Sequence, residues 1–200
     1  MYMIVHRDDT VRIPPDMLSY DMDTIIDELT HTNFEGKMNH EGQMTIQTMN
    51  VDRKGDGRIA HGDAGVYQNV SFDAIVFKPM MYEVVMGTVC EVLKYGVFVR
   101  IGPLDGLLHI SQVMDDHIDV DLANERLVGK ETKRDIKVGD RVRVRIVTVS
   151  INEKNPRESK IGLTMRQPGL GKLDWIEEDK KKDSEEEETP AKKSKKRSKK

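Results

Sequence analysis

Aromatic and basic side chains alternate with aliphatic ones in the segment YGVFVRIGPLDGLLHIS, residues 95–111. Successive side chains of a strand point to opposite faces, so an aliphatic face toward a core leaves Phe98, Arg100 and His109 on the outer face. Exposed rings stack on the bases of single-stranded nucleic acid, and cationic side chains meet its phosphates. A Phe on an outer face can also lie under a loop, and the pattern by itself leaves both interpretations open.

A second set of basic side chains follows in the sequence RVRVRI, where Arg141, Arg143 and Arg145 share one face of an expected strand. Eight basic and three acidic residues lie between Arg126 and Arg145. This excess favours a phosphate or an acidic protein as the partner of that face. A solvated arginine face is the equally simple alternative.

The remaining polar motifs do not match a catalytic or metal-binding pattern. DDHIDVD, residues 115–121, offers carboxylates of the kind that hard cations take as ligands. It lacks the glycine and the distal glutamate of an EF-hand loop, which favours a solvated acidic face. HGDAG, residues 61–65, is typical of a turn rather than of a nucleophile elbow. The single cysteine, Cys90, excludes a disulfide framework and a cysteine-based zinc site. We therefore expect no catalytic residue, no metal and no cofactor.

The first eighty residues predict a small α+β unit. A strand should end at Pro14–Pro15, and Asp16 is then the expected N-cap of a helix that stops between Asn33 and Gly36. Helical spacing places an apolar stripe along this helix: Leu18, Met22, Ile25, Ile26 and Leu29. Further strands, separated by glycine turns, are expected over residues 44–51, 58–60 and 70–77. Together they predict one main helix on an antiparallel sheet, residues 1–80.

From residue 81 onward, the pattern is all-β. Five short strands with glycine turns predict a small closed barrel of the OB type: residues 84–92, 96–101, 106–110, 141–150 and 160–165. This domain should span residues 81–172, with a polar insert at about 112–140 that we expect to be part helix. Residues 173–200 carry blocks of like charge in a low-complexity sequence, and they predict a disordered charged tail.

Charge is distributed unevenly along the 200 residues, whose formal net charge is −3. Residues 1–81 carry 7 basic and 13 acidic side chains, and residues 82–172 carry 15 and 13. Polyanions are attracted by positive potential, so a nucleic-acid partner should bind the second region. The chain has no apolar run of about 18 residues and no secretory signal pattern, so we expect a cytoplasmic protein without a membrane span.

The strand-rich region resembles an S1 RNA-binding domain. The resemblance rests on EVVMGTVCEVLKYGVFVRIGPLDGLLHISQV, then VGDRVRVRIVTV, then KIGLTMR, which follow one another in the order of that motif. Together with the alternation, it implies an RNA-binding face made by five side chains: Tyr95, Phe98, Arg100, His109 and Lys160. Ser150 departs from the motif, which often has an acidic residue at that position, and this departure bears on the RNA affinity.

The pattern up to about Met165 is similar to the family of archaeal DNA-directed RNA polymerase subunits called E-prime, counterparts of the seventh-largest subunit of eukaryotic RNA polymerase II. The similarity rests on PPD before the helix, FEGK after it, GRIAHGDAG, and the passage FKPMMYEVVMGTV into the barrel. It implies a non-catalytic protein that forms a heterodimeric stalk with a smaller helical partner known as F and binds the emerging single-stranded RNA transcript. It also implies a glycine-rich tip that docks on the RNA polymerase core: Gly55, Gly57, Arg58, Gly62 and Gly65.

Two other classes of function share the barrel. An S1 adaptor in translation initiation or RNA decay would lack the helix-and-tip unit ahead of it. An enzyme with an accessory S1 barrel would need a catalytic constellation elsewhere in the chain, and the sequence offers none. Both contrasts favour the polymerase subunit.

Overall fold

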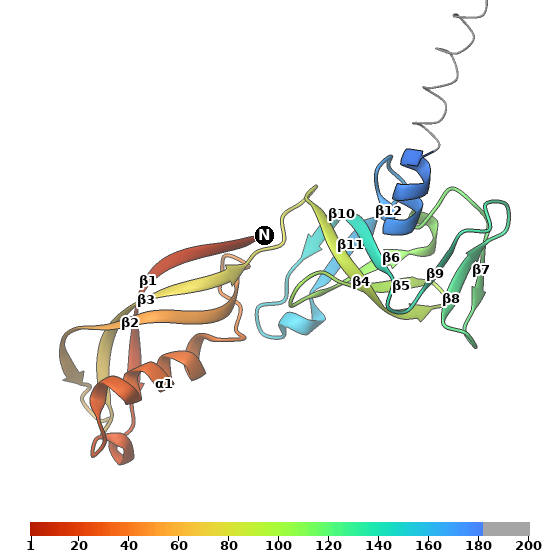
Figure 1. Ribbon diagram of the computed structural model, residues 1–200. Helices are drawn as coiled ribbons and strands as arrows, with labels where there is room; N and C mark the ends of the chain where they lie inside the picture. The colour runs from red at the N-terminus through yellow and green to blue at the C-terminus, as the bar shows by residue number, and fades with distance from the viewer. Residues whose placement is uncertain (182–200) are drawn as a thin grey trace, which may run out of the picture. The chain divides into compact units, whose positions relative to one another are not determined.

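The computed structural model describes residues 1–181, which fall into two compact units (Figure 1). The N-terminal unit holds Met1–Met80 and Ser150–Ser159, and the barrel unit holds Met81–Val149 and the described residues 160–181. Among the described residues, no helix has both the length and the apolar character needed to cross a bilayer. The disorder that the sequence predicts for residues 182–200 lies outside the described residues.

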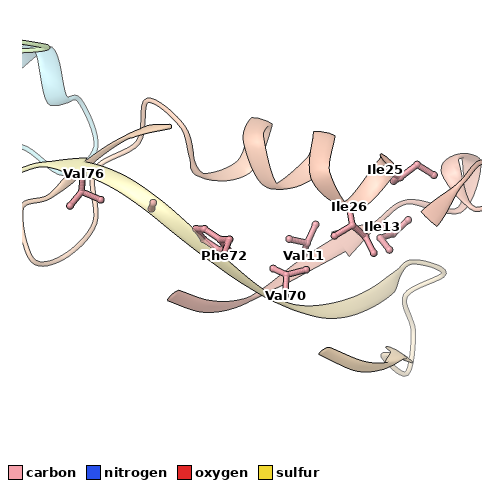
Figure 2. Packing of buried hydrophobic residues seen from close by; sticks show 8 residues of the cluster. Val11, Ile13, Ile25, Ile26, Val70, Phe72 and Val76 are labelled. Carbon is pink, nitrogen blue, oxygen red and sulfur yellow. The ribbon is translucent and has the colours of Figure 1, made fainter. Parts of the chain in front are cut away.

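One helix and a three-stranded antiparallel sheet form the N-terminal unit, as predicted. β1 (Tyr2–Ile13), β2 (Met44–Ile59) and β3 (Val66–Phe77) lie in the order β1-β3-β2, and α1 (Met22–Phe34) packs on one face. Apolar side chains fill the space between the helix and the sheet (Figure 2): Val11, Ile13, Ile25, Ile26, Val70, Phe72, Ala74 and Val76. The ring centres of Phe34 and Phe72 lie 4.9 Å apart, so an aromatic contact joins the end of the helix to the central strand.

The helix starts later than predicted, because its N-cap is Asp21 rather than Asp16. The Asp21 carboxylate accepts hydrogen bonds from the backbone N–H (3.1 Å) and the hydroxyl (2.7 Å) of Thr24, which satisfies a free donor of the first turn. Asp16 lies instead in a single 3-10 turn, η1 (Pro15–Met17). Leu18, expected on the apolar stripe, therefore precedes the helix and is 39% exposed.

β2 continues through residues 55–57, where the sequence predicts glycine turns and then a separate short strand. The register with β3 shifts between Lys54 and Arg58, so a bulge interrupts the ladder and pairing resumes beyond it. The buried side-chain amide of Gln68 donates hydrogen bonds to the carbonyls of Lys54 and Gly55, both at 3.1 Å. A side chain thus replaces the backbone donors that the bulge removes from these carbonyls.

Five strands of the barrel unit close into a barrel, as predicted. Their order is β11-β6-β5-β4-β10, and the additional pairing of β11 with β10 joins the two edges. The strands match the expected ranges closely: β4 (Val84–Leu93), β5 (Gly96–Arg100), β6 (Asp105–His109), β10 (Arg141–Ser150) and β11 (Lys160–Thr164). Single 3-10 turns follow β6 and precede β11: η2 (Ile110–Gln112) and η3 (Pro156–Glu158).

The insert is a three-stranded antiparallel sheet, so the prediction of a partial helix is wrong. β7 (Ile118–Asp121), β8 (Arg126–Gly129) and β9 (Asp135–Lys137) pair in the order β7-β8-β9. Leu127 and Ile136 lie opposite each other and are both fully buried. Because each of these strands contributes so few buried residues, their period of two is hard to see among the charged residues.

The chain beyond the barrel keeps regular structure for longer than predicted. β12 (Gly171–Lys172) pairs with β10, and residues 173–181 are helical. Trp175 and Ile176 are buried in this segment, and the Arg134 guanidinium lies 5.4 Å from the centre of the Trp175 ring. These two apolar anchors explain why the expected disorder from residue 173 is wrong for the part that the structure describes.

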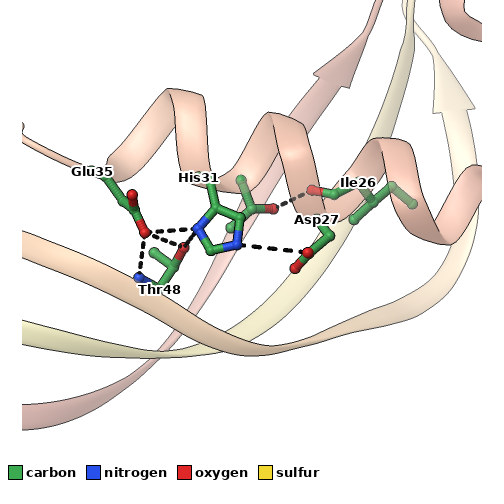
Figure 3. A network of polar contacts seen from close by, with 6 residues as sticks. Ile26, Asp27, His31, Glu35 and Thr48 are labelled. Carbon is green, nitrogen blue, oxygen red and sulfur yellow. Dashed lines mark hydrogen bonds and ion pairs between the residues drawn. The ribbon is translucent and has the colours of Figure 1, made fainter.

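A polar network joins the end of α1 to β2 (Figure 3). His31 Nδ1 lies 2.7 Å from a carboxylate oxygen of Glu35, and Nε2 lies 3.6 Å from one of Asp27. The backbone N–H of Thr48 donates to the same Glu35 oxygen at 2.8 Å. The hydrogen bond with Glu35 raises the pKa of His31. Burial opposes the ionisation of Glu35, but the bonds from Thr48 and His31 outweigh it and lower the Glu35 pKa.

This network should make the stability of the N-terminal unit depend on pH. The raised pKa of His31 contributes stability that is complete below about pH 6.5 and is lost as the pH rises through the folded-state value. The lowered pKa of Glu35 contributes stability that is complete above about pH 4.3 and is lost as the pH falls through the folded-state value. His31→Ala should therefore reduce the free energy of unfolding most near pH 6, by up to about 1 kcal/mol because the pair is partly exposed, and less at pH 9.

Urea denaturation followed by circular dichroism measures this difference. In a Glu35→Gln background, the loss caused by His31→Ala should vary much less with pH. A loss that keeps its full pH dependence in that background would contradict the assigned ion pair.

Gln68→Leu tests the support of the bulge in β2. We expect the free energy of unfolding to fall by about 1–2 kcal/mol, because two backbone carbonyls lose their donor. Gln47→Leu makes the same change at an exposed position of β2, so it is the matched control and should change the free energy of unfolding by no more than about 0.5 kcal/mol. Equal losses in the two variants would show that the Gln68 amide does not support the bulge.

Candidate nucleic-acid interface

The outer face of β5 and β6 carries the side chains that the alternation predicts there. Val97 and Val99 are fully buried, whereas Phe98 between them is half-buried and Arg100 is exposed. His109 is exposed at the end of β6. The period of two is thus kept in both strands, so the aliphatic residues fill the interior and the ring of Phe98 faces outward.

Phe98 lies in a row of residues that crosses four strands. It pairs with Glu91 of β4 on one side and with Leu107 of β6 on the other, and Leu107 lies opposite Gly162 of β11. Gly162 has no side chain and Leu107 is half-buried, so the only ring in this row belongs to Phe98. An outward ring with no other ring beside it in the row can receive a planar base.

His109 and Tyr95 meet the solvent beside this row. His109 lies opposite Gly96, so no side chain of β5 covers its ring at that position. Its Nδ1 accepts the N–H of Ser111 at 3.2 Å, which places the ring proton of the neutral form on Nε2 and orients the ring. Tyr95, in the turn between β4 and β5, is 50% exposed, and its carbonyl accepts the N–H of Ile110 at 2.9 Å.

Arg100 and Lys160, the two cations of this face, differ in whether a carboxylate already contacts them. Arg100 donates a hydrogen bond to Asp105 on the neighbouring strand at 3.1 Å, which raises the pKa of the guanidinium. Lys160 is exposed and has no acidic partner among residues 1–181. The parallel register that sets Gly162 opposite Leu107 brings Lys160 level with Asp105. Lys160 is therefore the freer of the two cations to meet a phosphate.

The structure brings Phe98, Arg100, His109 and Lys160 onto one face of three adjacent strands and places Tyr95 at its border. The sequence did not reveal Glu91 on this face, nor the cross-strand pairings that place Glu91, Leu107 and Gly162 in one row with Phe98. Their positions depend on the register between strands that are distant in sequence, and alternation within one strand carries no information about that register.

The arginine stripe lies on another part of the barrel, along β10. Arg143 lies opposite Met86 and Arg145 opposite Val84, and both of these apolar side chains are exposed. Arg141 is exposed as well. Arginine and methionine together are typical of protein interfaces, so of the two partners that the sequence suggested for this stripe, this composition favours a protein.

The acidic run of the insert is engaged in ion pairs. Three of its carboxylates contact cations of the same unit: Asp115 contacts Arg166, Asp119 contacts Lys130, and Asp121 contacts Arg126. Within the described part of the chain, no three His, Cys, Asp or Glu side chains gather in a way that could hold a metal ion. The run is thus accounted for by local electrostatics.

Residues 55–65, here called the tip, comprise the end of β2 and the loop that joins it to β3. Gly55 and Gly62 have φ angles of 67° and 89°, which a residue with a side chain adopts only under strain. A Cβ at Gly57 would come within 2.5 Å of a Val66 methyl group. Arg58 lies within β2, beyond the bulge. The glycines therefore permit a backbone path that other residues would not allow.

Asp63 holds the turn of the tip together. Its carboxylate accepts two hydrogen bonds from Arg12 (2.8 and 2.6 Å) and one from the N–H of Gly65 (3.0 Å). The Arg12 guanidinium holds the pKa of Asp63 well below its usual range, with further help from Gly65 and Tyr67. The side chain of Ile59, at the end of β2, is 72% exposed. The tip thus combines a braced backbone with an exposed apolar residue.

Known proteins match this chain over two different lengths. Residues 78–160 match the S1 RNA binding domain family. DNA-directed RNA polymerase subunit Rpo7 of Sulfolobus acidocaldarius is 36% identical over 179 residues, which cover 90% of this chain and 97% of that one. DNA-directed RNA polymerase III subunit RPC8 of Bos taurus is 25% identical, with 88% and 98% covered. Ribonuclease R of Escherichia coli is 33% identical over only 88 residues, 43% of this chain and 11% of that one.

The lengths of these matches separate the functions that the sequence left open. The similarity to Rpo7 extends through the N-terminal unit as well as the barrel, whereas the similarity to ribonuclease R accounts for less than half of the chain. The chain therefore belongs to the family of DNA-directed RNA polymerase subunit Rpo7, and its barrel contains an S1 RNA binding domain.

Proposed function

We propose that this protein is a non-catalytic subunit of a DNA-directed RNA polymerase and that its S1 barrel binds the single-stranded RNA leaving the enzyme. The observation that carries the proposal is the similarity to Rpo7 over nearly the whole of both chains. In this role it corresponds to the archaeal E-prime subunit and to the seventh-largest subunit of eukaryotic RNA polymerase II. It forms a heterodimeric stalk with the small helical partner F.

The outer face of β5, β6 and β11 is the RNA-binding surface in this proposal. Phe98 and His109 each receive a base, and Tyr95 extends the stacking surface at its border. Lys160 meets the phosphates, with Arg100 contributing less because Asp105 already accepts its hydrogen bond. The tightness of RNA binding then depends more on stacking than on net charge.

The tip docks on the RNA polymerase core. The N-terminal unit is rich in acidic residues, so phosphate binding there is unfavourable and a protein partner is preferred. Gly55, Gly57, Arg58, Gly62 and Gly65 shape the tip, and Ile59 offers an apolar side chain that a pocket can bury.

Separate apolar surfaces on the two units are suited to the small helical partner of the stalk. In the N-terminal unit, Tyr2 and Ile4 on the edge strand β1 are exposed by 57% and 70%. In the barrel unit, Val84 and Met86 on β4 are exposed beside the arginine stripe. Exposed apolar side chains grouped in this way are typical of surfaces that a partner covers.

The role of stacking is tested by the double variant Phe98→Ala with His109→Ala. We expect its affinity for single-stranded RNA to fall by about 1–3 kcal/mol for each base that loses its ring, as measured by fluorescence anisotropy. Leu122→Ala with His117→Ala removes a large apolar side chain and an imidazole from exposed positions of the insert, so this control should bind as the wild type does. Unchanged affinity in a folded Phe98/His109 variant would remove the stacking surface from the proposal.

The docking role is tested by purifying the tagged full-length protein from a native lysate. The wild type should recover the polymerase core together with a small helical protein, and recovery of ribosomal or exosome components instead would contradict the proposal. Ile59→Asp should weaken binding to the core by about tenfold or more, because burial of an isoleucine contributes about 1.5–3 kcal/mol. Leu122→Asp, a similar change on the insert, should leave recovery of the polymerase core unchanged. If Ile59→Asp recovers as much core as the wild type does, Ile59 is not part of the docking surface.

A further inference from the structure

A bulge in β4 directs the carboxylate of Glu91 onto the RNA-binding face. Val85 and Val89 point into the barrel, and a regular alternation from them would also turn Glu91 inward. The register between β4 and β5 shifts between Val89 and Glu91, because Cys90 is an extra residue. Glu91 is therefore exposed opposite Phe98, and Val92 is buried in its place. Bulges commonly re-aim a side chain at a functional surface.

A negative charge lies on one side of Phe98 and a positive charge on the other. Neighbouring strands lie about 4.8 Å apart, so the carboxylate of Glu91 is one strand away from Phe98 on the β4 side. Lys160 lies two strands away on the opposite side, on β11. A nucleotide whose base stacks on Phe98 and whose phosphate meets Lys160 directs the outer edge of its base toward Glu91.

A carboxylate at this place repels phosphate, so it weakens general binding to RNA. No ion pair neutralises it among the described residues. As an ionised group it can only accept hydrogen bonds. Cytosine and adenine present amino groups on their base edges, and Glu is a common acceptor for the N4 amino group of cytosine. Uracil has a carbonyl oxygen at the position where cytosine has this amino group, and this partly negative acceptor cannot donate a hydrogen bond to the carboxylate and is repelled by it.

We propose that Glu91 selects the base stacked on Phe98 in favour of bases with an exocyclic amino group and against uracil. The inference rests on the proposed RNA-binding function and adds to it a preference that the platform residues alone do not provide, since every base has a face that can stack. The contrast between cytosine and uracil is the sharpest, because the two rings have the same size and differ at the group that meets Glu91.

The experiment measures binding of the full-length protein to short oligocytidylate and oligouridylate at neutral pH and one fixed salt concentration. The wild type should bind oligocytidylate about tenfold more tightly, the usual order for one contact to a base edge. In Glu91→Gln, whose amide both donates and accepts, the ratio of the two affinities should fall toward one. Glu131→Gln removes the same charge from an exposed position of the insert and should keep the wild-type ratio.

The ratio separates this inference from the function on which it rests. A ratio that is the same in the wild type and in Glu91→Gln overturns the role of Glu91, even if the absolute affinity rises with the loss of a negative charge. If Phe98→Ala weakens binding of both oligonucleotides in that case, the proposed RNA-binding surface still stands. If Phe98→Ala leaves both affinities unchanged, the surface itself is wrong and the preference falls with it.

Discussion

Closure of the five-stranded barrel is the constraint on which the rest of the candidate site depends. β11 pairs in parallel with β6 and also pairs with β10, so the sheet has no free edge between these strands. A closed barrel this small must fill its interior with aliphatic side chains, and the period of two then sends their neighbours outward. Phe98 is held outward because Val97 and Val99 occupy the interior on either side of it. The rings of Phe98 and His109 and the cations Arg100 and Lys160 share one surface as a direct result.

Bulges in β4 and β2 interrupt the regular strand pairing, and neighbouring groups stabilise each of them. In β4, the extra residue Cys90 reverses the phase of alternation, so that Glu91 reaches the outer face while Val92 closes the interior. In β2, the bulge near Gly55 is supported by the buried amide of Gln68. A bulge removes backbone hydrogen bonds, so it persists where other groups satisfy the backbone or where packing favours the new phase.

Many of the basic side chains of the barrel unit already form ion pairs. Its basic side chains outnumber its acidic ones only slightly, and several of them already contact a carboxylate: Arg100, Arg126, Lys130, Arg134, Arg166 and Lys172. Lys172 has a raised pKa although burial opposes its charge, because the Asp140 carboxylate stabilises it. In the RNA-binding surface that we propose, the sign of the net charge is therefore a weaker guide than the position of Lys160 beside aromatic and imidazole rings.

The sequence by itself determined the five barrel strands, their inward and outward faces and the α+β character of the first unit. These follow from periodicity and turn residues, which are local properties of the chain. It did not reveal that Asp21 caps α1, because Asp16 is an equally good cap residue nearby. It also did not reveal the small sheet of the insert or the helical segment that buries Trp175, because charged residues dominate the sequence in and beside both.

Only the tertiary structure decided which residues meet across strands. Glu91, Phe98, Leu107 and Gly162 form one row although they are spread over 72 residues of sequence. The bulge in β4 and the parallel pairing of β6 with β11 determine which residues share that row. Both are favoured by barrel closure and interior packing rather than by local conformational preference. The outward ring of Phe98 could be chosen from the sequence, whereas the carboxylate of Glu91 opposite it required the fold.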